Sequence, residues 1–261
     1  MKITLLGTGT SSGVPVIGCH CPVCMSSDPR DRRTRTSALF ETESTRIIID
    51  CGPDFREQMI PQTFRRLNAV FVTHEHYDHV GGLDDLRPLC VFGDIDVYAD
   101  PLAASRLRQR IPYCFVESKY PGVPNINLYD MHPHEVVTVG DIAVQAISVM
   151  HGKLPILGFR IGNVAYITDM KTLPDTEWEL LQGIELLIVN GLRYATHATH
   201  QSVEEACQFS EKLGSPETWL VHMSHHVGLH SEVDNQLPEH VHLAFDGKTF
   251  NVDYDGVRTL S

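Results

Sequence analysis

Three histidines and an aspartate within six residues constrain this chain more than any other feature. The segment His74-Glu75-His76-Tyr77-Asp78-His79 directly follows the apolar run Ala69–Thr73 and precedes Gly81 and Gly82. A short run rich in β-branched and aromatic residues predicts a buried strand, so these side chains should lie at a strand end on a rigid support. Imidazole nitrogens and carboxylate oxygens are ligands of zinc, manganese and iron. The motif therefore predicts a metal site rather than a polar loop rich in histidine.

The rest of the chain alternates short apolar runs with helical patterns. Ser202 and Glu205 form a capping-box pair before a helix, and Pro101–Arg110 and Asp175–Leu181 are predicted helices. The predicted strands are Lys2–Leu6, Arg46–Ile49, Ala69–Thr73, Ile142–Val149, Val164–Thr168, Leu186–Val189, Thr218–Val221 and Leu243–Phe245. This order fits either two packed sheets with helices outside or an open α/β sheet. Without a repeat or a long linker, we expect a single domain over residues 1–261, with a small zinc-binding loop near 19–24.

Composition limits the partners and the compartment. The 261 residues include 21 Lys and Arg against 33 Asp and Glu, which gives a formal net charge of -12. Binding long nucleic acid needs a basic face, so the charge balance argues against that partner. No apolar run approaches the ~20 residues that span a bilayer, so no membrane partner is expected. The chain also has no pattern typical of a signal peptide, and we expect a cytoplasmic protein with reduced cysteines.

Further candidate ligands stand at the ends of other predicted strands. His151 follows Ile147–Met150, Asp169 follows Ala165–Thr168, and His222 follows Trp219–Val221. With the histidine motif, this set and its order resemble the metallo-β-lactamase superfamily. The resemblance implies an α+β fold, a four-layer αββα sandwich with a two-metal centre at one edge.

The resemblance also implies how the ligands are shared between two divalent ions, either manganese or zinc. One ion would take His74, His76 and His151, the other would take Asp78, His79 and His222, and Asp169 would bridge them. Asp50 closes the apolar run Arg46–Ile49 and matches a strand-end aspartate of the superfamily. We expect Asp50 to orient a ligand rather than to bind a metal itself.

A second candidate metal site lies near the N-terminus. Cys19, Cys21 and Cys24 can hold one tetrahedral zinc if a fourth ligand comes from elsewhere. Idle buried cysteines and a redox pair at Cys21 and Cys24 are the alternatives. With the later segment His222-Met223-Ser224-His225, the cysteines narrow the resemblance to the PhnP group of the superfamily. That resemblance implies a structural zinc bound by Cys19, Cys21, Cys24 and His225.

The resemblance implies that His200, just before the helix at Ser202, is a proton donor rather than a metal ligand. The predicted catalytic residues are His200 and the metal ligand Asp78. His197 is expected to face the substrate or to contact the metal ligands without binding metal itself. At Asn190 the chain departs from the family pattern, in which an acidic residue usually occupies this strand end. The remaining histidines are expected to be structural or exposed: His20, His132, His134, His226, His230, His240 and His242.

The expected function is hydrolysis of a small phosphodiester, with metal-bound hydroxide as nucleophile and His200 as general acid. The PhnP resemblance implies a cyclic substrate, of the phosphoribosyl cyclic phosphate or cyclic nucleotide type, and a homodimer. A tRNA 3′-processing endonuclease is one alternative, but no basic arm for tRNA is visible in the sequence. The others are a lactone or thioester hydrolase on the same site and a non-catalytic metal-binding protein.

Overall fold

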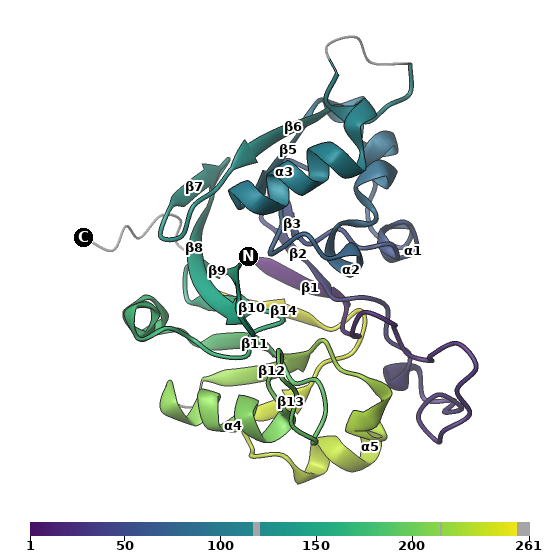
Figure 1. The fold of residues 1–261 in the computed structure, drawn as a ribbon, viewed down its shortest axis with the longest axis vertical. Coiled ribbons are helices and arrows are strands. Elements are labelled where there is room, and N and C mark those ends of the chain that lie inside the picture. Colours follow the sequence, from purple (N-terminus) through teal and green to yellow (C-terminus); the bar gives the residue numbers. More distant parts are fainter. Residues whose placement is uncertain (117–120, 215, 255–261) are drawn as a thin grey trace.

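The computed structural model describes residues 1–116, 121–214 and 216–254. Within this part of the chain, fourteen strands form two seven-stranded sheets that pack face to face (Figure 1). The first sheet has the order β14-β1-β2-β3-β4-β5-β6 and the second β13-β12-β11-β10-β9-β8-β7. Helices cover the outer faces, so the predicted αββα sandwich is confirmed and the open α/β sheet is excluded.

Each sheet has an antiparallel half and a parallel half. In the first sheet β1, β2 and β3 are antiparallel, whereas β3 to β6 are parallel. In the second sheet β7 to β10 are antiparallel and β10 to β13 are parallel. The strands of the first sheet are Lys2–Gly7 (β1), Ser37–Glu41 (β2), Arg46–Ile49 (β3), Ala69–Phe71 (β4), Ile95–Ala99 (β5), Ile126–Asp130 (β6) and Thr249–Asn251 (β14). Those of the second are Val136–Val139 (β7), Ile142–His151 (β8), Leu154–Ile161 (β9), Val164–Ile167 (β10), Leu186–Asn190 (β11), Glu217–Val221 (β12) and Val241–Leu243 (β13).

The helices are short and amphipathic. The α-helices are Phe55–Met59 (α1), Tyr77–Val80 (α2), Pro101–Arg110 (α3), Val203–Lys212 (α4) and His230–Val233 (α5). The capping box of α4 forms as predicted: Ser202 N donates to Glu205 Oε2 at 2.8 Å and Glu205 N donates to Ser202 Oγ at 3.2 Å. Residues Asp175–Leu181, predicted as a helix, form a 3₁₀ helix. Among the described residues, no helix combines the length and apolar character needed to cross a membrane.

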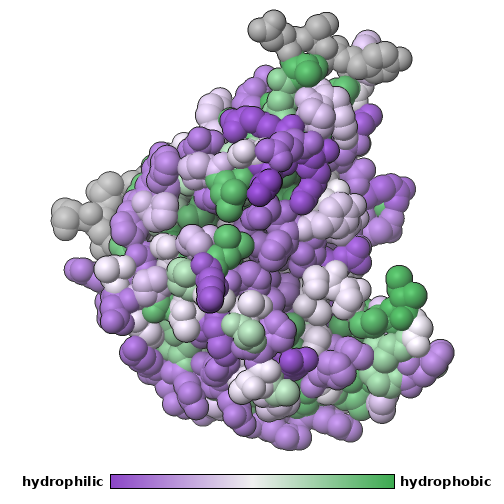
Figure 2. Space-filling model, viewed as in Figure 1, coloured by the Kyte–Doolittle hydropathy of each residue, from purple (hydrophilic) through white to green (hydrophobic). Residues whose placement is uncertain are grey.

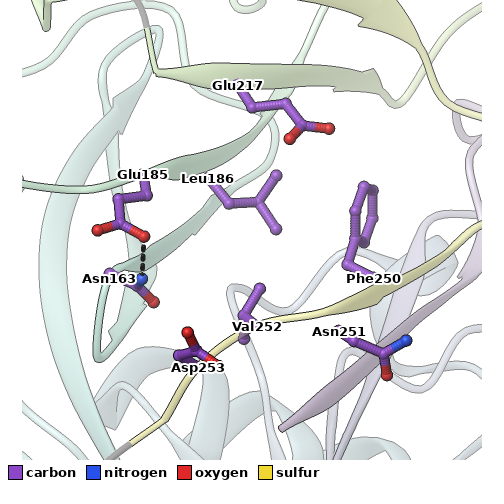
Figure 3. A pocket seen from close by; sticks show the side chains of 8 residues that line it. All are labelled: Asn163, Glu185, Leu186, Glu217, Phe250, Asn251, Val252 and Asp253. Atoms are coloured by element: carbon purple, nitrogen blue, oxygen red, sulfur yellow. Dashed lines mark hydrogen bonds between the residues drawn. The ribbon is translucent and has the colours of Figure 1, made fainter.

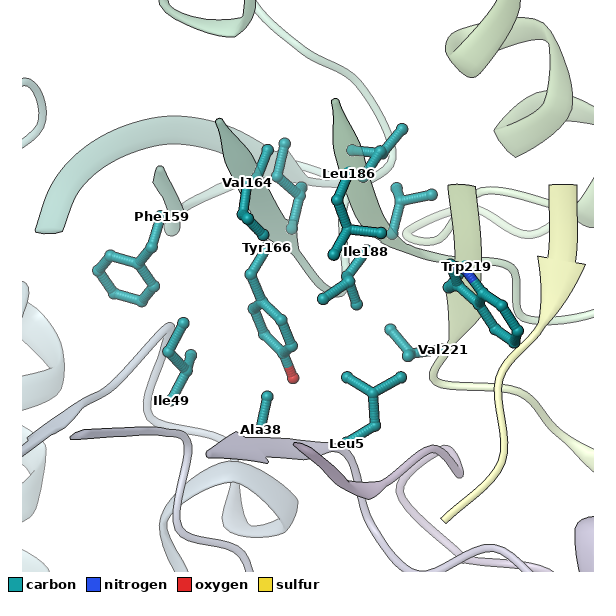
Figure 4. Close-up of a cluster of buried hydrophobic side chains, with 14 of the residues drawn as sticks. Leu5, Ala38, Ile49, Phe159, Val164, Tyr166, Leu186, Ile188, Trp219 and Val221 are labelled. Carbon is teal, nitrogen blue, oxygen red and sulfur yellow. The ribbon is translucent and has the colours of Figure 1, made fainter. Parts of the chain in front are cut away.

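The main hydrophobic core fills the space between the two sheets (Figure 4). Side chains of Leu5 and Ile49 from the first sheet face Phe159, Tyr166 and Ile188 from the second, and all five are buried. A second core lies on the outer face of the first sheet, under α1 and α3. In β3, Ile47 and Ile49 enter the main core and Ile48 enters the second core. Because both faces of this strand are buried, all three positions are apolar and β-branched.

The surface is mainly hydrophilic on the face shown in Figure 2. A hollow indents this face between the part that carries α1 and α2 and the part formed by the long loop after β1 (Figures 1 and 2). That loop contains the cysteine cluster and returns to the sheet at β2. The hollow thus lies beside two segments that the sequence predicts to bind metals.

Candidate metal centre

Three strand ends carry buried polar residues in an unusual backbone conformation. Asp50 directly follows β3, Asp169 comes shortly after β10, and His222 directly follows β12. The φ angles of these residues are 63°, 58° and 55°. Non-glycine residues rarely adopt this left-handed region, and such strain persists only where surrounding contacts hold it in place. Asp169 and His222 follow the carboxyl ends of parallel strands of the second sheet, whereas Asp50 follows a strand of the first sheet. The three residues converge at the same edge of the sandwich, where His79 lies close to both aspartates.

The first ligand set consists of His74, His76 and His151. Their nearest ring nitrogens lie within 4.8 Å of one another. His74 Nε2 is 2.9 Å from His76 Nδ1, a separation at which both nitrogens can face one cation. His74 and His151 are buried, whereas His76 is exposed. The structure thus brings together the three histidines that the resemblance assigned to one ion.

The second set consists of Asp78, His79, Asp169 and His222, which are all buried and whose donor atoms also lie within 4.8 Å of one another. His79 Nε2 is 3.2 Å from Asp78 Oδ2 and 3.4 Å from Asp169 Oδ1. His222 Nε2 is 3.3 Å from an oxygen of each aspartate. On the other side, Asp169 Oδ2 is 4.0 Å from His74 Nε2. Asp169 therefore lies between the two sets, where a bridging carboxylate would be needed.

Each of three histidines is held by one ring nitrogen, so that the other faces the centre. His79 Nδ1 is 2.7 Å from Asp50 Oδ2, and His151 Nδ1 is 2.7 Å from the carbonyl oxygen of Asp169. His74 Nδ1 is 3.0 Å from the hydroxyl of Thr73. The buried Nε2 of His79 has no hydrogen-bond partner. Metal-binding histidines are commonly held in this way, and the donor set fits two divalent cations.

Glycine allows the Asp50 loop to pack against the histidine motif. A Cβ added at Gly52 would lie 2.1 Å from the carbonyl oxygen of Asp78, a separation that no side chain tolerates. The backbone N–H of Cys51 also donates to the carbonyl oxygen of His79 at 2.7 Å. Asp50 itself accepts from the backbone N–H of Thr73 at 2.8 Å. These contacts fix the Asp50 carboxylate beside His79, as expected for a residue that orients a ligand.

The charges of the centre are set by burial and by the mixture of acids and imidazoles. Burial opposes ionisation of Asp169, but His222 and His79 outweigh it and hold the pKa of Asp169 well below its usual range. Burial likewise opposes the charge on His79, but Asp169 and Asp50 raise its pKa well above the ordinary value. Burial and the neighbouring His79 lower the pKa of His74. Asp169 is thus ionised and His74 neutral, which are the forms that bind cations, whereas a cation bound by His79 would have to displace its proton.

His200 lies against Asp169 and the two ligand sets. Its Nε2 is 3.0 Å from Asp169 Oδ2, and its ring stacks on that of His222 with centroids 5.0 Å apart. On its other side, Nδ1 is 2.9 Å from Thr199 Oγ1 and 3.2 Å from His197 Nδ1. Burial lowers the pKa of His200, although Asp169 opposes this effect. His200 is therefore within reach of the centre, and its role as a proton donor stays a prediction.

The cysteine cluster closes around a histidine from the far end of the chain. His225 Nδ1 lies 3.3, 3.2 and 3.5 Å from the Sγ atoms of Cys19, Cys21 and Cys24. In a tetrahedral zinc site with ordinary bond lengths, sulfur and nitrogen ligands are about 3.6 Å apart. Backbone N–H groups of Val16 and Cys24 donate to Sγ atoms of Cys24 and Cys21, both at 3.4 Å. The four side chains thus fit a closed zinc site.

Two groups near the centre were not singled out in the sequence. The Thr168 hydroxyl donates to Asp169 Oδ1 at 2.6 Å, and the Thr73 hydroxyl lies 2.9 Å from Asp50 Oδ2. Each threonine directly precedes a predicted ligand at a strand end, and that position is the signal that could have identified it. The default expectation for His230 agrees with its surroundings: it is buried, and its backbone N–H donates to Asp31 at 2.8 Å.

A separate hollow lies at the other ends of the parallel strands. It measures about 310 Å³ and is lined by residues that begin β11 and β12 and by residues of the C-terminal segment (Figure 3). Asn163 Nδ2 donates to Glu185 Oε2 at 2.6 Å on its rim. Because Asp169 and His222 follow the opposite ends of these strands, this hollow is remote from the metal centre.

Comparison with known proteins agrees with this geometry. Residues 45–223 match the beta-lactamase superfamily domain, which covers more than half of the chain. The chain therefore belongs to the metallo-β-lactamase superfamily, a family of hydrolases. A crystal structure described as a new diphosphatase from the PhnP family is 36% identical, with a TM-score of 0.89, and the match covers 95% of this chain and 96% of that one. Within the superfamily, the chain belongs to the PhnP family.

More distant or longer relatives show the same domain. Zinc-bound PqqB from Methylobacterium extorquens shares the fold at 19% identity, with a TM-score of 0.77 over 97% of this chain and all of that one. An octanoyltransferase of Porphyromonas gingivalis is 46% identical over 99% of this chain but only 53% of its own length. A ribonuclease Z of Thermosynechococcus vestitus is 30% identical over 62% of this chain and 36% of its own. The match therefore spans about half or less of these two curated relatives.

Proposed function

We propose that this chain is a two-metal phosphodiesterase that hydrolyses a small, cyclic phosphodiester. The observation that carries the proposal is the position of Asp169 between two ligand sets, with His200 Nε2 in contact with it at 3.0 Å. Two adjacent cation sites with a proton donor beside them suit phosphoryl transfer, in which charge develops on several oxygens at once. The similarity to a PhnP-family diphosphatase over nearly the whole chain supports phosphorus rather than carbon as the reacting centre.

Two divalent ions, manganese or zinc, are proposed for the catalytic centre, and one zinc for the cysteine site. His74, His76 and His151 would hold one catalytic ion, Asp78, His79 and His222 would hold the other, and Asp169 would bridge them. When bound, such ions lower the pKa of a water molecule and offset the charge of phosphoryl oxygens. The protein contributes the spacing of the ligand sets and the contacts that keep each imidazole aimed at the centre.

His200 would hold a proton for the departing oxygen of the substrate. Its side chain is 12% exposed, so that a bound ligand can reach it, while Thr199 Oγ1 and His197 fix the far side of the ring. Imidazole suits this step because its ordinary pKa lies near neutrality, and the contact of His200 with Asp169 opposes the lowering of its pKa by burial. Asp78, the other predicted catalytic residue, would act by binding metal together with His222, whose Nε2 lies 3.3 Å from its Oδ2.

The substrate is proposed to be small because the formal net charge of -12 works against holding a long polyanion. A phosphoribosyl cyclic phosphate or a cyclic nucleotide fits this description. A diphosphate ester is a second candidate, favoured by the diphosphatase name of the similar PhnP-family structure. Acyl ester or thioester hydrolysis is a third, favoured by the octanoyltransferase name of a relative that is 46% identical but twice as long.

A direct test uses bis-p-nitrophenyl phosphate with protein loaded with Mn²⁺ or Zn²⁺. We expect turnover by the parent and by Asp94→Ala, in which an exposed aspartate is removed, but none by Asp169→Ala. A diphosphate ester and an octanoyl thioester are assayed in parallel with the same proteins. Faster cleavage of the thioester than of any phosphate ester, at equal metal loading, would reject the proposal in favour of the acyl alternative.

Homodimerisation and a cytoplasmic location belong to the same proposal, since both are implied by the family resemblance. Light scattering during gel filtration measures the mass directly. A value near 29.2 kDa, the mass of one chain, would reject the dimer.

A further inference from the structure

Asn190 occupies the strand end between the two strands that carry Asp169 and His222. It is the last residue of β11, which pairs in parallel with β10 on one side and β12 on the other. Its side chain is fully buried. A buried amide needs partners for both its oxygen and its nitrogen, so the question is which groups satisfy it.

Both partners belong to one residue, Met170, directly after the proposed bridging ligand. Asn190 Oδ1 accepts from the backbone N–H of Met170 at 2.7 Å, and Asn190 Nδ2 donates to the backbone carbonyl of Met170 at 3.0 Å. The backbone groups fix the orientation of the amide, because an N–H can only donate and a carbonyl can only accept. An aspartate in this place would keep the acceptor but lose the donor.

The hydrogen bonds hold the backbone where it is strained. Asp169 has a φ angle of 58°, and the segment after it must be held if its carboxylate is to stay between the ligand sets. The carbonyl oxygen of Met170 also accepts from the backbone N–H of Gln201 at 2.9 Å, next to His200. The Met170 carbonyl oxygen thus accepts from both Asn190 and Gln201. Met170 directly follows Asp169 and Gln201 directly follows His200, so this one group links Asn190 to both segments.

The residue after Asn190 makes the matching contact on the other side. Gly191 N–H donates to the carbonyl oxygen of Val221 at 2.9 Å, directly before His222, whose φ angle is 55°. The dipeptide Asn190-Gly191 therefore bonds to Met170, directly after Asp169, and to Val221, directly before His222.

We infer that Asn190 is a positioning residue that fixes Asp169 as the bridge between the two cation sites. This inference rests on the proposed role of Asp169 as a metal ligand. An amide supplies both bonds to Met170 at any pH, whereas a carboxylate would lack the donor. Groups that orient metal ligands commonly change metal affinity by 10- to 100-fold when they are removed.

The test measures Mn²⁺ binding to protein that keeps the zinc of the cysteine site but has no other metal. We compare Asn190→Asp, which removes the donor, and Asn190→Ala, which removes both hydrogen bonds without adding charge. The matched control is Asn235→Asp, which makes the same change at an exposed position. We expect one of the two Mn²⁺ ions to bind about 10- to 100-fold more weakly in both Asn190 variants, with no change in the control.

A second readout separates positioning from general stability. The rise in melting temperature caused by Mn²⁺ should be smaller in both Asn190 variants, because less binding energy is linked to folding. An Asn190→Ala protein that melts at lower temperature but binds two Mn²⁺ ions with the parent affinity would overturn the inference. Failure of Asn190→Ala to fold even with saturating Mn²⁺ would also overturn the inference, since Asn190 would then serve folding alone. Binding is measured without substrate, so an inactive parent would reject the proposed function and leave this result standing.

Discussion

Cys21 and His225 lie 3.2 Å apart, Sγ to Nδ1, although 204 positions separate them in the chain. The proposed zinc would close this long loop and tie the segment after β1 to the segment after β12. His222, a proposed catalytic ligand, is only three residues from His225. The two proposed metal sites therefore share one short segment, and loss of metal from one site should disturb the position of the ligands in the other.

Loss of the zinc site should destabilise the protein. We expect Cys24→Ala to bind one zinc fewer per chain and to unfold more easily by about 2–4 kcal/mol, by analogy with the opening of a long cross-linked loop. For a chain of this size, that corresponds to a melting temperature lower by roughly 4–16 °C. Calorimetry and metal analysis measure both effects.

Cys207→Ala is the control for this variant, since Cys207 lies on α4 and takes no part in the cluster. The control should keep its full zinc content. An unchanged zinc content in Cys24→Ala would contradict the assigned ligand set.

Asp50 should control the catalytic metals through His79. Asp50→Asn weakens the contact of Oδ2 with His79 Nδ1, now 2.7 Å, and places an amide where the imidazole needs an acceptor. We expect about 10- to 100-fold weaker binding of one catalytic metal ion, with the cysteine-bound zinc retained. Competition with a fluorescent chelator measures the affinity. Equal affinities in variant and parent would show that the buried aspartate serves folding rather than metal binding.

His200 should affect the rate without affecting metal content. We expect His200→Gln to keep its full catalytic metal content and to lose about 10²- to 10⁴-fold in kcat, the usual contribution of general acid catalysis. Exposed His226 provides the matched control, and His226→Gln should keep the parent rate. If His200→Gln lost metal along with activity, His200 would have to be reassigned as a ligand, beside His151 and Asp169.

Glu177, which belongs to none of the ligand sets, should make stability depend on pH. Burial opposes its charge, but hydrogen bonds from His134, the Ser148 N–H and Thr176 outweigh burial and lower its pKa. A carboxyl whose pKa is lower in the folded state stabilises the protein above its unfolded pKa of about 4.3. This stabilisation is lost as the pH falls through the folded pKa.

Glu177→Gln should therefore lower the melting temperature at pH 7 by about 2–8 °C, the effect of losing about 1–2 kcal/mol from charged hydrogen bonds. The difference from the parent should shrink as the pH is lowered from 5 towards 3. Glu179→Gln, at an exposed position of the same 3₁₀ helix, should behave like the parent at every pH. A difference for Glu177→Gln that is independent of pH would contradict the electrostatic explanation.

Much of the sandwich was predictable because several strands are continuous apolar runs. The structure places β3 over Arg46–Ile49, as predicted, and β11 and β12 differ from prediction by one residue each. These strands are buried on both faces, so their sequences carry a strong signal. β9 was not predicted, because Pro155 and Gly158 interrupt it and both residues are unusual inside strands. Its register comes from pairing with β8, which no local pattern records.

The residues of the centre were identifiable because each follows an apolar run and belongs to a chemically distinctive type. The contacts around them were not identifiable, since they depend on backbone geometry. The bonds from Asn190 to Met170 require Asp169 in a left-handed conformation and β11 between β10 and β12. Neither condition is visible in a single sequence, where Asn190-Gly191 has the composition of an ordinary turn.

The order in which the zinc ligands occur also has a consequence for synthesis of the protein. Cys19 and His225 are 206 positions apart, so the proposed site cannot close until at least 206 further residues have been made after Cys19. At about 5–20 residues per second, the three thiols wait roughly 10–40 s for their histidine. During that time they are open to oxidation and to capture by other thiophilic metals. Producing cells with a limited zinc supply should therefore accumulate newly made chains that are mispaired or wrongly metallated, while chains completed earlier keep their zinc.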